Sequence, residues 1–202
     1  LKIAFHISFV LGAIAFIAIS VVAVQRLQKA AEMVPKLPEI MEGLRNRPST
    51  IVSSDGTILY SQQENYRKAV KRSEIPENVV SAILAAEDKR FYDHGGIDPI
   101  ALARILFVAA KEGDASQGGS TLTMQVAKRV FTGDSPTIER KLDNMALAVQ
   151  IERILTKDQI LELYANESYF GERAYGIAAA ADVYFGKTLD ELTISEAATL
   201  AR

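Results

Sequence analysis

The feature that most constrains this chain is an uncharged apolar run near its N-terminus, from Ile3 to Val24. At about 1.5 Å of rise per helical residue, this run would form a helix of about 33 Å, enough to cross a hydrocarbon core of ~30 Å. A cleaved signal peptide is the alternative, but its apolar core usually has only ~7–15 residues and a small-residue cleavage site follows it. Here Val24 is followed directly by Gln25 and Arg26. We therefore predict that residues 1–24 form one transmembrane helix.

The charges beside this run give little information about its orientation. Lys2 precedes the run, whereas Arg26, Lys29 and Lys36 follow it, and this distribution alone argues against export of the C-terminal part. Because Leu1 is not an initiator methionine, we expect a longer polypeptide with further charges upstream.

Prolines divide the chain that follows the apolar run. Pro35 and Pro38 interrupt any helix that continues from the run, and Pro48 marks a second stop, because proline disrupts helix geometry. We predict a juxtamembrane connector at residues 25–49 and one folded domain at residues 50–202. The total length of 202 residues leaves no room for two unrelated large domains.

The composition excludes several kinds of site. The chain has no cysteine, which rules out disulfides, thiolate metal sites and a cysteine nucleophile. Its two histidines, His6 and His94, cannot form a multi-histidine zinc site. Without the six basic and three acidic residues of residues 1–50, 17 basic and 22 acidic residues remain, so the domain lacks the basic field that nucleic acid requires. Any catalysis therefore depends on carboxylates, hydroxyls, amides and basic groups.

The local patterns predict a mainly α domain with a small β-hairpin and no internal repeat. Two short apolar runs at residues 50–53 and 57–60 flank the turn dipeptide Asp55-Gly56. Later segments carry helix-start signals, which are proline in a first turn, a hydroxyl N-cap or a capping-box spacing. These signals lie at Pro76, Pro99, Ser120, Pro136, Thr156 and Thr193.

The first cluster of candidate chemistry runs from Glu87 to Asp98 and is dense in titratable groups. Glu87 ends an apolar helical stretch, where a carboxylate is partly removed from water, and the nearby imidazole of His94 can position it. Such a carboxylate suits proton transfer. A solvated helix end is the alternative interpretation.

Two further clusters carry groups that favour anions. A double glycine precedes Ser120 at a predicted helix start, where free backbone N–H groups suit an anionic oxygen. The amide of Gln125 and the ammonium of Lys128 follow on the same helix, and the pair Arg140-Lys141 lies on a later one. Together these groups suit a diphosphate. A simple turn and an exposed helix face are the alternatives.

Taken together, the clusters resemble the peptidoglycan glycosyltransferase domain of class A penicillin-binding proteins and the monofunctional transglycosylases. The first cluster matches the family pattern E-D-x-x-F-x-x-H-x-G, beginning at Glu87. The second matches G-G-S-T-I/L-T-x-Q-x-x-K from Gly118 to Lys128. Further family elements follow between residues 157 and 198, so the resemblance covers about residue 50 to the end.

The resemblance implies a mainly α, lysozyme-like fold and an inverting glycosyltransferase that polymerises lipid II into glycan strands and releases undecaprenyl diphosphate. It implies that Glu87 is the general base, which removes the proton of the acceptor GlcNAc 4-hydroxyl. The residues that the resemblance assigns to substrate binding are Asp88, Phe91, His94, Gly119, Ser120, Thr121, Gln125, Lys128, Arg140 and Lys141.

One position departs from the family pattern. The third motif is R-K-x-x-E, and here Arg140-Lys141 is followed at the position of the second family carboxylate by Asn144. Asparagine keeps a carbonyl acceptor but cannot carry charge, accept a proton or anchor a divalent cation strongly. A catalytically impaired paralogue that binds lipid II or cell-wall partners is therefore an open alternative. A lysozyme-like enzyme that cleaves glycans is another, because there a single Glu acting as acid would suffice.

The resemblance also implies the surroundings of the domain. The expected partners are lipid II, the growing glycan strand and membrane lipids, together with a C-terminal transpeptidase domain and other cell-wall synthesis proteins, because the family pattern continues beyond Arg202. The expected cofactor is a divalent cation, Mg or Mn, without certain protein ligands and without an organic cofactor. The expected location is the bacterial cytoplasmic membrane, crossed once, with the catalytic domain on its outer (periplasmic or extracellular) side.

Overall fold

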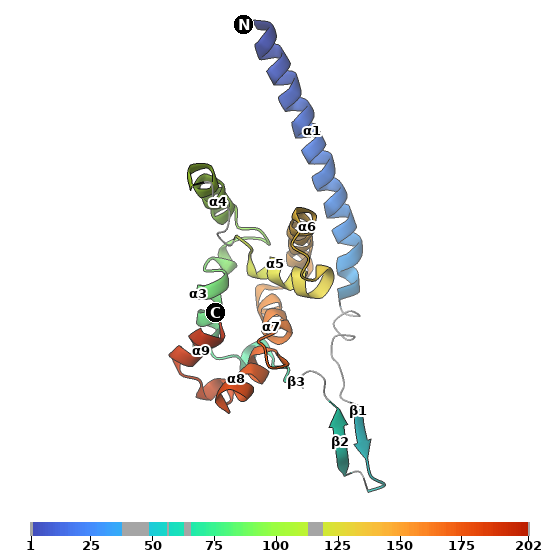
Figure 1. The fold of residues 1–202 in the computed structure, drawn as a ribbon, viewed down its shortest axis with the longest axis vertical. Helices are drawn as coiled ribbons and strands as arrows, with labels where there is room; N and C mark the ends of the chain where they lie inside the picture. The colour runs from blue at the N-terminus through green and yellow to red at the C-terminus, as the bar shows by residue number, and fades with distance from the viewer. Residues whose placement is uncertain (1, 38–48, 56, 63–65, 113–118, 202) are drawn as a thin grey trace.

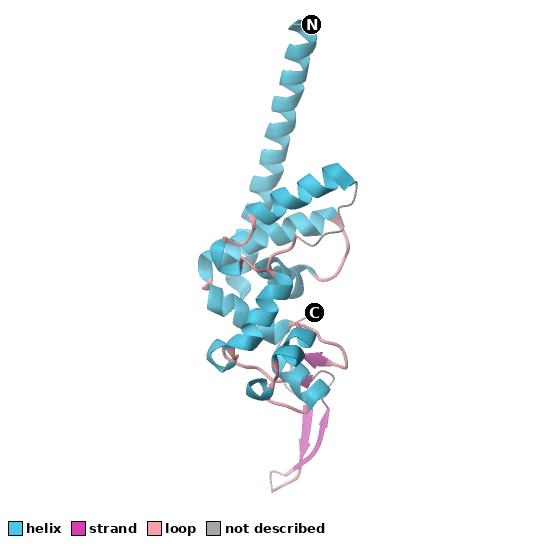
Figure 2. Cartoon of the chain, turned by 90° about the vertical axis from the view of Figure 1, so that its left-hand side faces the viewer, coloured by secondary structure: helices cyan, strands magenta, loops and turns pink. Residues whose placement is uncertain are grey.

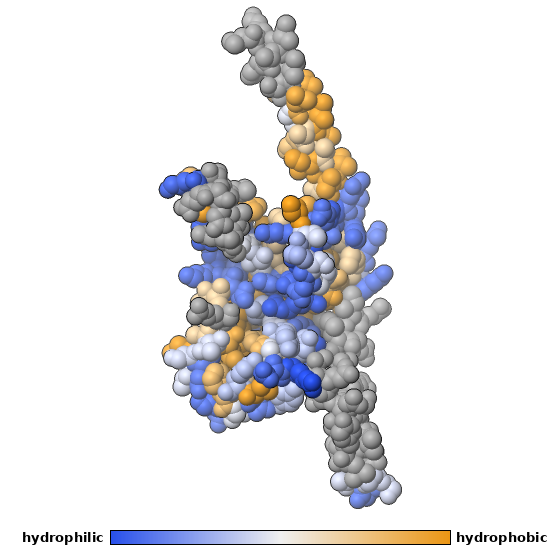
Figure 3. All heavy atoms as spheres, viewed as in Figure 1, coloured by the Kyte–Doolittle hydropathy of each residue, from blue (hydrophilic) through white to orange (hydrophobic). Residues whose placement is uncertain are grey.

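The computed structural model describes residues 2–37, 49–55, 57–62, 66–112 and 119–201. Helix α1 (Lys2–Met33) leaves a helical domain as a straight rod, and a β-hairpin lies at the opposite end of the molecule (Figure 1). Hydrophobic residues follow the projecting part of α1 (Figure 3). By length and composition, α1 is apolar and long enough to cross a membrane.

Helix α1 continues past the predicted anchor, so residues 25–33 of the predicted connector are helical. No proline or glycine interrupts these residues, and the helix ends at Met33, before the short 3-10 turn η1 (Val34–Lys36) that contains Pro35. Ala30 and Val34 are buried in the hydrophobic core of the domain. The C-terminal part of α1 is therefore an integral part of the domain, while residues 38–48 of the predicted connector lie outside the described residues.

The predicted β-hairpin is confirmed. Strands β1 (Ser49–Val52) and β2 (Ile58–Gln62) pair in antiparallel register, and the Asp55 carboxylate accepts the backbone N–H of Thr57 within the turn at 3.0 Å. A second, parallel pair joins β3 (Tyr66–Arg67) to β4 (Ala174–Tyr175). The sequence did not indicate it, because strands of two residues are too short to show an alternating pattern.

The rest of the described chain is mainly helical, as predicted (Figure 2). The α-helices are α3 (Glu77–Glu87), α4 (Pro99–Glu112), α5 (Leu122–Ala127), α6 (Ile138–Ile154), α7 (Lys157–Glu167), α8 (Ile177–Phe185) and α9 (Ile194–Leu200). Shorter turns are the 3-10 segments η2 (Arg72–Glu74), η3 (Phe91–Asp93) and η5 (Leu189–Glu191) and the π-helical η4 (Lys128–Thr132).

Two of the predicted helix starts are shifted. The N-cap of α5 is Thr121 and not Ser120, since the Thr121 hydroxyl accepts the backbone N–H of Met124 at 3.2 Å. Helix α6 begins after Thr137, whose hydroxyl accepts the N–H of Arg140, and not at Pro136. The predicted capping boxes are confirmed at α7 and at α9.

Helix α5 lies in the middle of the core, and its Leu122, Thr123, Met124, Val126 and Ala127 are all buried. Helices α6 and α7 pack against it, so this short helix carries the second sequence motif into the centre of the domain. The backbone of the motif is therefore held by packing on several sides.

The core packing of α6 predicts that two isoleucines one turn apart differ greatly in how much stability is lost when each is replaced by alanine. Ile151 is completely buried, whereas Ile154 is 54% exposed. We expect Ile151→Ala to lower the free energy of unfolding by about 2–5 kcal/mol, because the cavity loses packing contacts. The matched Ile154→Ala change is expected to cost about 0.5 kcal/mol or less. Urea unfolding in detergent, followed by circular dichroism, measures both, and equal losses would contradict this view of the α6 core.

Candidate active site

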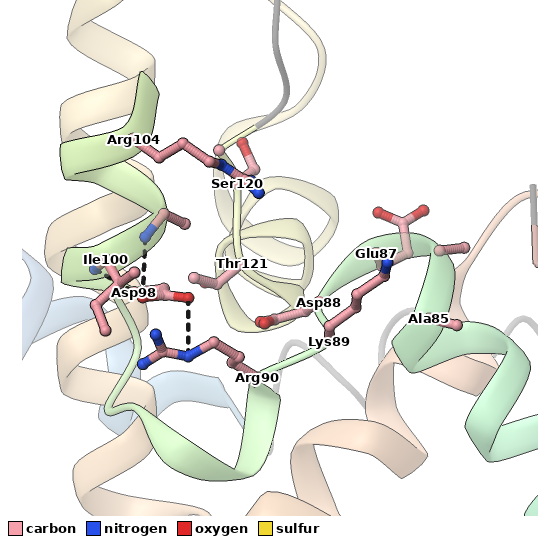
Figure 4. Close-up of a pocket in the computed structure, with 13 residues that line it drawn as sticks. Ala85, Glu87, Asp88, Lys89, Arg90, Asp98, Ile100, Arg104, Ser120 and Thr121 are labelled. Carbon is pink, nitrogen blue, oxygen red and sulfur yellow. Dashed lines mark hydrogen bonds and ion pairs between the residues drawn. The ribbon is translucent and has the colours of Figure 1, made fainter. Parts of the chain in front are cut away.

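A cleft of about 540 Å³ lies between the end of α3, the start of α4 and the segment before α5. It brings together the first two sequence motifs, since Glu87 and Asp88 line it together with Gly119, Ser120 and Thr121. Figure 4 shows Arg104 reaching toward Ser120 on one side of the cleft, with Glu87 on the other.

Glu87 is the last residue of α3, where the helix delivers its carboxylate to the edge of the cleft. The side-chain amide of Gln125 donates to one carboxylate oxygen at 3.3 Å, and the hydroxyl of Tyr164 donates to the other at 3.1 Å. These two donors come from α5 and α7, so three helices fix the position of one half-buried carboxylate.

Asp88, next in the chain, is buried and joins the two motifs. One of its oxygens accepts the backbone N–H of Leu122, in the first turn of α5, at 3.0 Å. His94 Nε2 lies 2.9 and 3.0 Å from the two carboxylate oxygens. This buried pair therefore ties the loop after α3 to the start of α5, and the structure gives both residues a positioning role.

Phe91 and the backbone of His94 are supported from α7. Phe91 is completely buried in the core, which leaves it no surface for a substrate contact in this conformation. Lys157 Nζ lies 4.3 Å above the Phe91 ring and donates to the His94 carbonyl at 2.6 Å and to Glu152 at 2.7 Å. The Glu152 carboxylate also accepts the hydroxyl of Thr123 at 2.6 Å.

Steric constraints explain why the first motif has a glycine at position 96. Its φ of +79° is unfavourable for other residues, and a Cβ there would lie 2.8 Å from the backbone of Ala148 in α6. Only glycine lets this loop lie directly against α6. The Thr121 hydroxyl then donates to the Gly96 carbonyl at 2.6 Å, which links the loop to the N-cap of α5.

Of the basic side chains that line the cleft, one is paired with a carboxylate and two form no ion pair with another described residue. Burial alone would raise the pKa of Asp98, but the N–H groups of Ala101 and Ile100 and the nearby Arg90 outweigh it and lower that pKa. Arg90 therefore pairs with an ionised Asp98, and its Nε lies 3.7 Å from a carboxylate oxygen of Asp98. Lys89 and Arg104 line the same cleft, and neither forms an ion pair with another described residue.

Two of the three predicted diphosphate-binding bases have other partners in the structure, and the third is exposed. Lys128 pairs with Asp134 at 2.5 Å, Arg140 donates to the Gly133 carbonyl at 3.2 Å, and Lys141 is exposed. Of the predicted diphosphate groups, the structure therefore places Ser120 in the cleft and Gln125 on Glu87, and it does not bring Lys128, Arg140 or Lys141 into contact with them.

Asn144 is buried in α6 rather than exposed in the cleft. Its side-chain oxygen accepts the hydroxyl of Thr132, at the end of η4, at 2.7 Å. One helical turn earlier, the Nε atom of Arg140 is buried without a hydrogen-bond partner. An unpaired donor therefore lies near the position where the family pattern has a carboxylate.

Two residues outside the predicted site complete the surroundings of Glu87. Burial raises the pKa of Tyr164; Arg129 opposes this shift and Glu87 adds to it, so Tyr164 stays a hydroxyl donor. The guanidinium of Arg129 lies 4.6 Å from the Tyr164 ring centre. Tyr164 belongs to a family sequence block, whereas Arg129 carries no signal in the sequence that separates it from a surface charge.

The residues present do not fit a divalent cation held by protein ligands. Within the described ranges, no three His, Asp or Glu side chains converge, and at the third motif a neutral Asn144 is bonded to Thr132. The divalent cation, Mg or Mn, that the resemblance implies stays a prediction.

The Asp88 contacts predict that this residue stabilises the fold. Asp88→Ala would leave the Leu122 N–H and the His94 imidazole buried without their partner, so we expect the free energy of unfolding to fall by about 3–5 kcal/mol. Asp93→Ala, in the same loop but exposed, is the control and is expected to change it by about 0.5 kcal/mol or less. Urea unfolding of both variants measures the difference, and an Asp88→Ala variant as stable as the parent would refute the role.

The fold and the site are those of a helical domain whose cleft combines carboxylates with basic groups, joined to a helix long and apolar enough to cross a membrane. The comparisons with known proteins make this class specific. A family model described as Transglycosylase matches residues 55–202, and the chain belongs to this transglycosylase family. The resemblance predicted from the motifs is thereby confirmed.

Individual relatives agree with the family. The chain is 50% identical over 155 residues to Penicillin-binding protein 1A of Haemophilus influenzae, covering 77% of this chain and 18% of the relative. It is 46% identical over 170 residues to Penicillin-binding protein 1A of Escherichia coli, covering 83% of this chain and 20% of that relative. The chain thus spans about a fifth of the length of these relatives. Compared with a crystal structure of Penicillin-Binding Protein 1A from Haemophilus influenzae, the chain has 27% sequence identity and a TM-score of 0.36. The match covers 77% of this chain and 13% of that one.

Proposed function

We propose that this domain polymerises lipid II into glycan strands and releases undecaprenyl diphosphate. The observation that carries the proposal is the Glu87 carboxylate, held at the cleft by donors from α5 and α7. A general base needs a fixed position, and the two donors provide it. Family membership supplies the reaction class.

In the proposed step, Glu87 removes the proton from the acceptor GlcNAc 4-hydroxyl. That oxygen forms a bond to the anomeric carbon of the donor MurNAc from the face opposite the diphosphate. The bond between this carbon and the diphosphate oxygen breaks, and its electron pair leaves with the undecaprenyl diphosphate. The configuration at the carbon is therefore inverted.

The leaving diphosphate needs cations and hydrogen-bond donors in fixed positions. We assign Ser120, Gln125, Lys128, Arg140 and Lys141 to it, as the family motifs imply. Lys128 is paired with the exposed Asp134, an ion pair of low free energy that a diphosphate can replace. Arg104, unpaired beside Ser120, is an additional basic group for an anionic substrate in the cleft.

A second candidate function has its own support. The buried neutral Asn144 and the unpaired Nε of Arg140 favour a catalytically impaired paralogue that binds lipid II or cell-wall partners. The lysozyme-like cleaving enzyme has less support, because cleavage of a glycan does not require diphosphate-binding groups.

One experiment separates these possibilities. The purified chain in detergent is incubated with labelled lipid II, with and without Mg²⁺ or Mn²⁺, and in parallel with preformed glycan strands. Polymer formation supports the glycosyltransferase, and shortening of the strands identifies a cleaving enzyme. Binding of lipid II without product identifies the impaired paralogue.

The location and partners belong to the same proposal. A substrate with a polyprenyl tail stays in the bilayer, so an enzyme joined to α1 meets it at the membrane surface. We place the domain on the outer side of the bacterial cytoplasmic membrane, with a transpeptidase domain and cell-wall synthesis proteins as partners.

The Tyr164 contact gives a prediction for this function. Tyr164→Phe removes one of the two donors to Glu87, and we expect the polymerisation rate to fall about tenfold, as for the loss of one hydrogen bond to a charged group. Tyr184→Phe is the control, because its hydroxyl donates only to the Phe170 carbonyl on the exposed surface. Initial rates with labelled lipid II measure both, and equal rates for the two variants would contradict the positioning of Glu87 by Tyr164.

A further inference from the structure

A second hollow of about 500 Å³ lies between α1 and α6, and Ile97 in the loop before α4 also lines it. Its α1 wall includes Ala18, Ile19 and Val22, and its α6 wall includes Leu142, Met145 and Val149. These side chains are apolar, and the groove offers almost no hydrogen-bonding surface.

The α6 wall is only partly covered, because α1 packs against α6 but leaves Met145 and Val149 half-buried. The residues that α6 buries are Asn144, Ala146, Leu147, Ala148 and Ile151. Leu142, on another side of the helix, stays 40% exposed. Apolar side chains that stay partly exposed at this position are unfavourable in water, but they are favourable in contact with hydrocarbon.

The position of the groove relative to the bilayer follows from the length of the apolar run. The run from Ile3 to Val24 would span about 33 Å as a helix, little more than the ~30 Å of a hydrocarbon core. If α1 crosses a bilayer, its last apolar turns at Ala18 to Val22 are therefore needed inside the hydrocarbon region. Side chains of α6 that face these turns lie at the same depth.

Charged groups mark the polar boundary just below the groove. Arg26 lines the groove and also a neighbouring pocket of about 340 Å³ that contains Lys29. Arg26 pairs with Asp143 at 2.7 Å, whereas Lys29 is exposed and forms no ion pair with another described residue. An apolar groove that ends at basic side chains matches a lipid with a hydrocarbon chain and an anionic headgroup.

We propose that the groove between α1 and α6 binds an acyl chain of a bilayer phospholipid, with the phosphate toward Arg26 and Lys29. The continuity of the groove with the projecting apolar surface of α1 selects the bilayer as the source of the occupant. The domain therefore rests partly within the membrane surface, and α6, which carries Arg140 and Asn144, is held at a fixed depth. The proposal depends on α1 as the membrane span and not on the enzymatic activity.

The absence of tryptophan from the chain gives a direct test, because one introduced tryptophan is then the only indole fluorophore. Leu142→Trp reports on the groove. This position is expected to tolerate the substitution because the Leu142 side chain is partly exposed. Phe16→Trp, on the projecting part of α1, is the positive control. Ile194→Trp, 75% exposed at the start of α9, is the negative control. Each variant is reconstituted in phosphatidylcholine and phosphatidylglycerol vesicles with or without brominated acyl chains, which quench tryptophan on contact.

We expect brominated lipid to quench Leu142→Trp about as strongly as Phe16→Trp and to leave Ile194→Trp nearly unchanged. Ala18→Leu, added to Leu142→Trp, fills part of the groove and is expected to reduce the quenching. Circular dichroism checks that each variant is folded, and a Met145→Trp variant replaces Leu142→Trp if that one is not.

Two results would overturn the proposal. If the groove tryptophan is quenched as weakly as Ile194→Trp, the groove does not contact acyl chains. If a small fraction of undecaprenyl diphosphate removes the quenching of Leu142→Trp but not that of Phe16→Trp, the occupant is an isoprenoid and not a phospholipid. Because the signal is fluorescence, the result does not depend on whether the chain polymerises lipid II.

Discussion

Replacing Glu87 by Gln is expected to lower lipid II polymerisation by about 10²–10⁴-fold, the usual contribution of a positioned acid–base group. The amide keeps the size of the side chain and can still contact Gln125 and Tyr164, so the surrounding helices stay in place. It cannot accept the proton of the acceptor hydroxyl. Initial rates with labelled lipid II measure the loss, and equilibrium binding of lipid II is expected to remain close to that of the parent.

A matched control lies on the same helix. Glu77, in the first turn of α3, is exposed and pairs with Arg72 at 2.6 Å, away from the cleft. Glu77→Gln is expected to leave the rate within about twofold of the parent, because exposed ion pairs contribute little. A Glu87→Gln variant that polymerises as fast as Glu77→Gln would remove Glu87 from the role of base.

Replacing Asn144 by Glu is expected to raise the polymerisation rate by about 10-fold to 100-fold, the effect of one hydrogen bond to a charged group. The physical reason is the buried Nε of Arg140, which has no partner and lies one helical turn before Asn144. A carboxylate at this position can pair with it and align the guanidinium for a diphosphate. We also expect the rate to become more dependent on Mg²⁺.

Asn144→Gln separates the effect of charge from that of length, since Gln matches Glu in size but is neutral. If both variants gain equally, the missing charge is not what limits the enzyme. If the parent is inactive and only Asn144→Glu polymerises lipid II, the chain is a disabled member of the family. Loss of folding in both variants, measured by urea unfolding, would show that the bond from Thr132 to Asn144 is needed for structure.

Local features of the fold were predictable because short stretches of sequence determine them. The hairpin turn at Asp55, the capping boxes at Thr156 and Thr193, and the end of α1 at Pro35 each depend on residues within one or two turns. The N-cap of α5 was misplaced by one residue. Ser120 and Thr121 have equivalent hydroxyls, and the contact of Thr121 with the distant Gly96 distinguishes them in the structure.

The candidate site was only partly predictable. The order of motif residues indicated Glu87 and Gln125, and the structure places their side chains in contact. The same motif contains Asp88, Phe91 and His94, and nothing in their spacing separated side chains that face a cleft from side chains buried behind it. Arg129 lacked any signal, because its place above the Tyr164 ring depends on how η4 and α7 are both arranged around α5.

One membrane-length apolar helix, a mainly α domain and the motifs of the family could all be predicted from the residues in order. Apolar length, helix caps and residue order are properties of the chain read along one dimension, so they need no knowledge of packing. Only the tertiary structure decided that the end of α1 is part of the domain core, that Asn144 is buried against Thr132, and that an apolar face of α6 lies beside α1. These facts join residues more than 100 positions apart in α1 and α6, or set the direction of one side chain, and such relations arise only when helices pack.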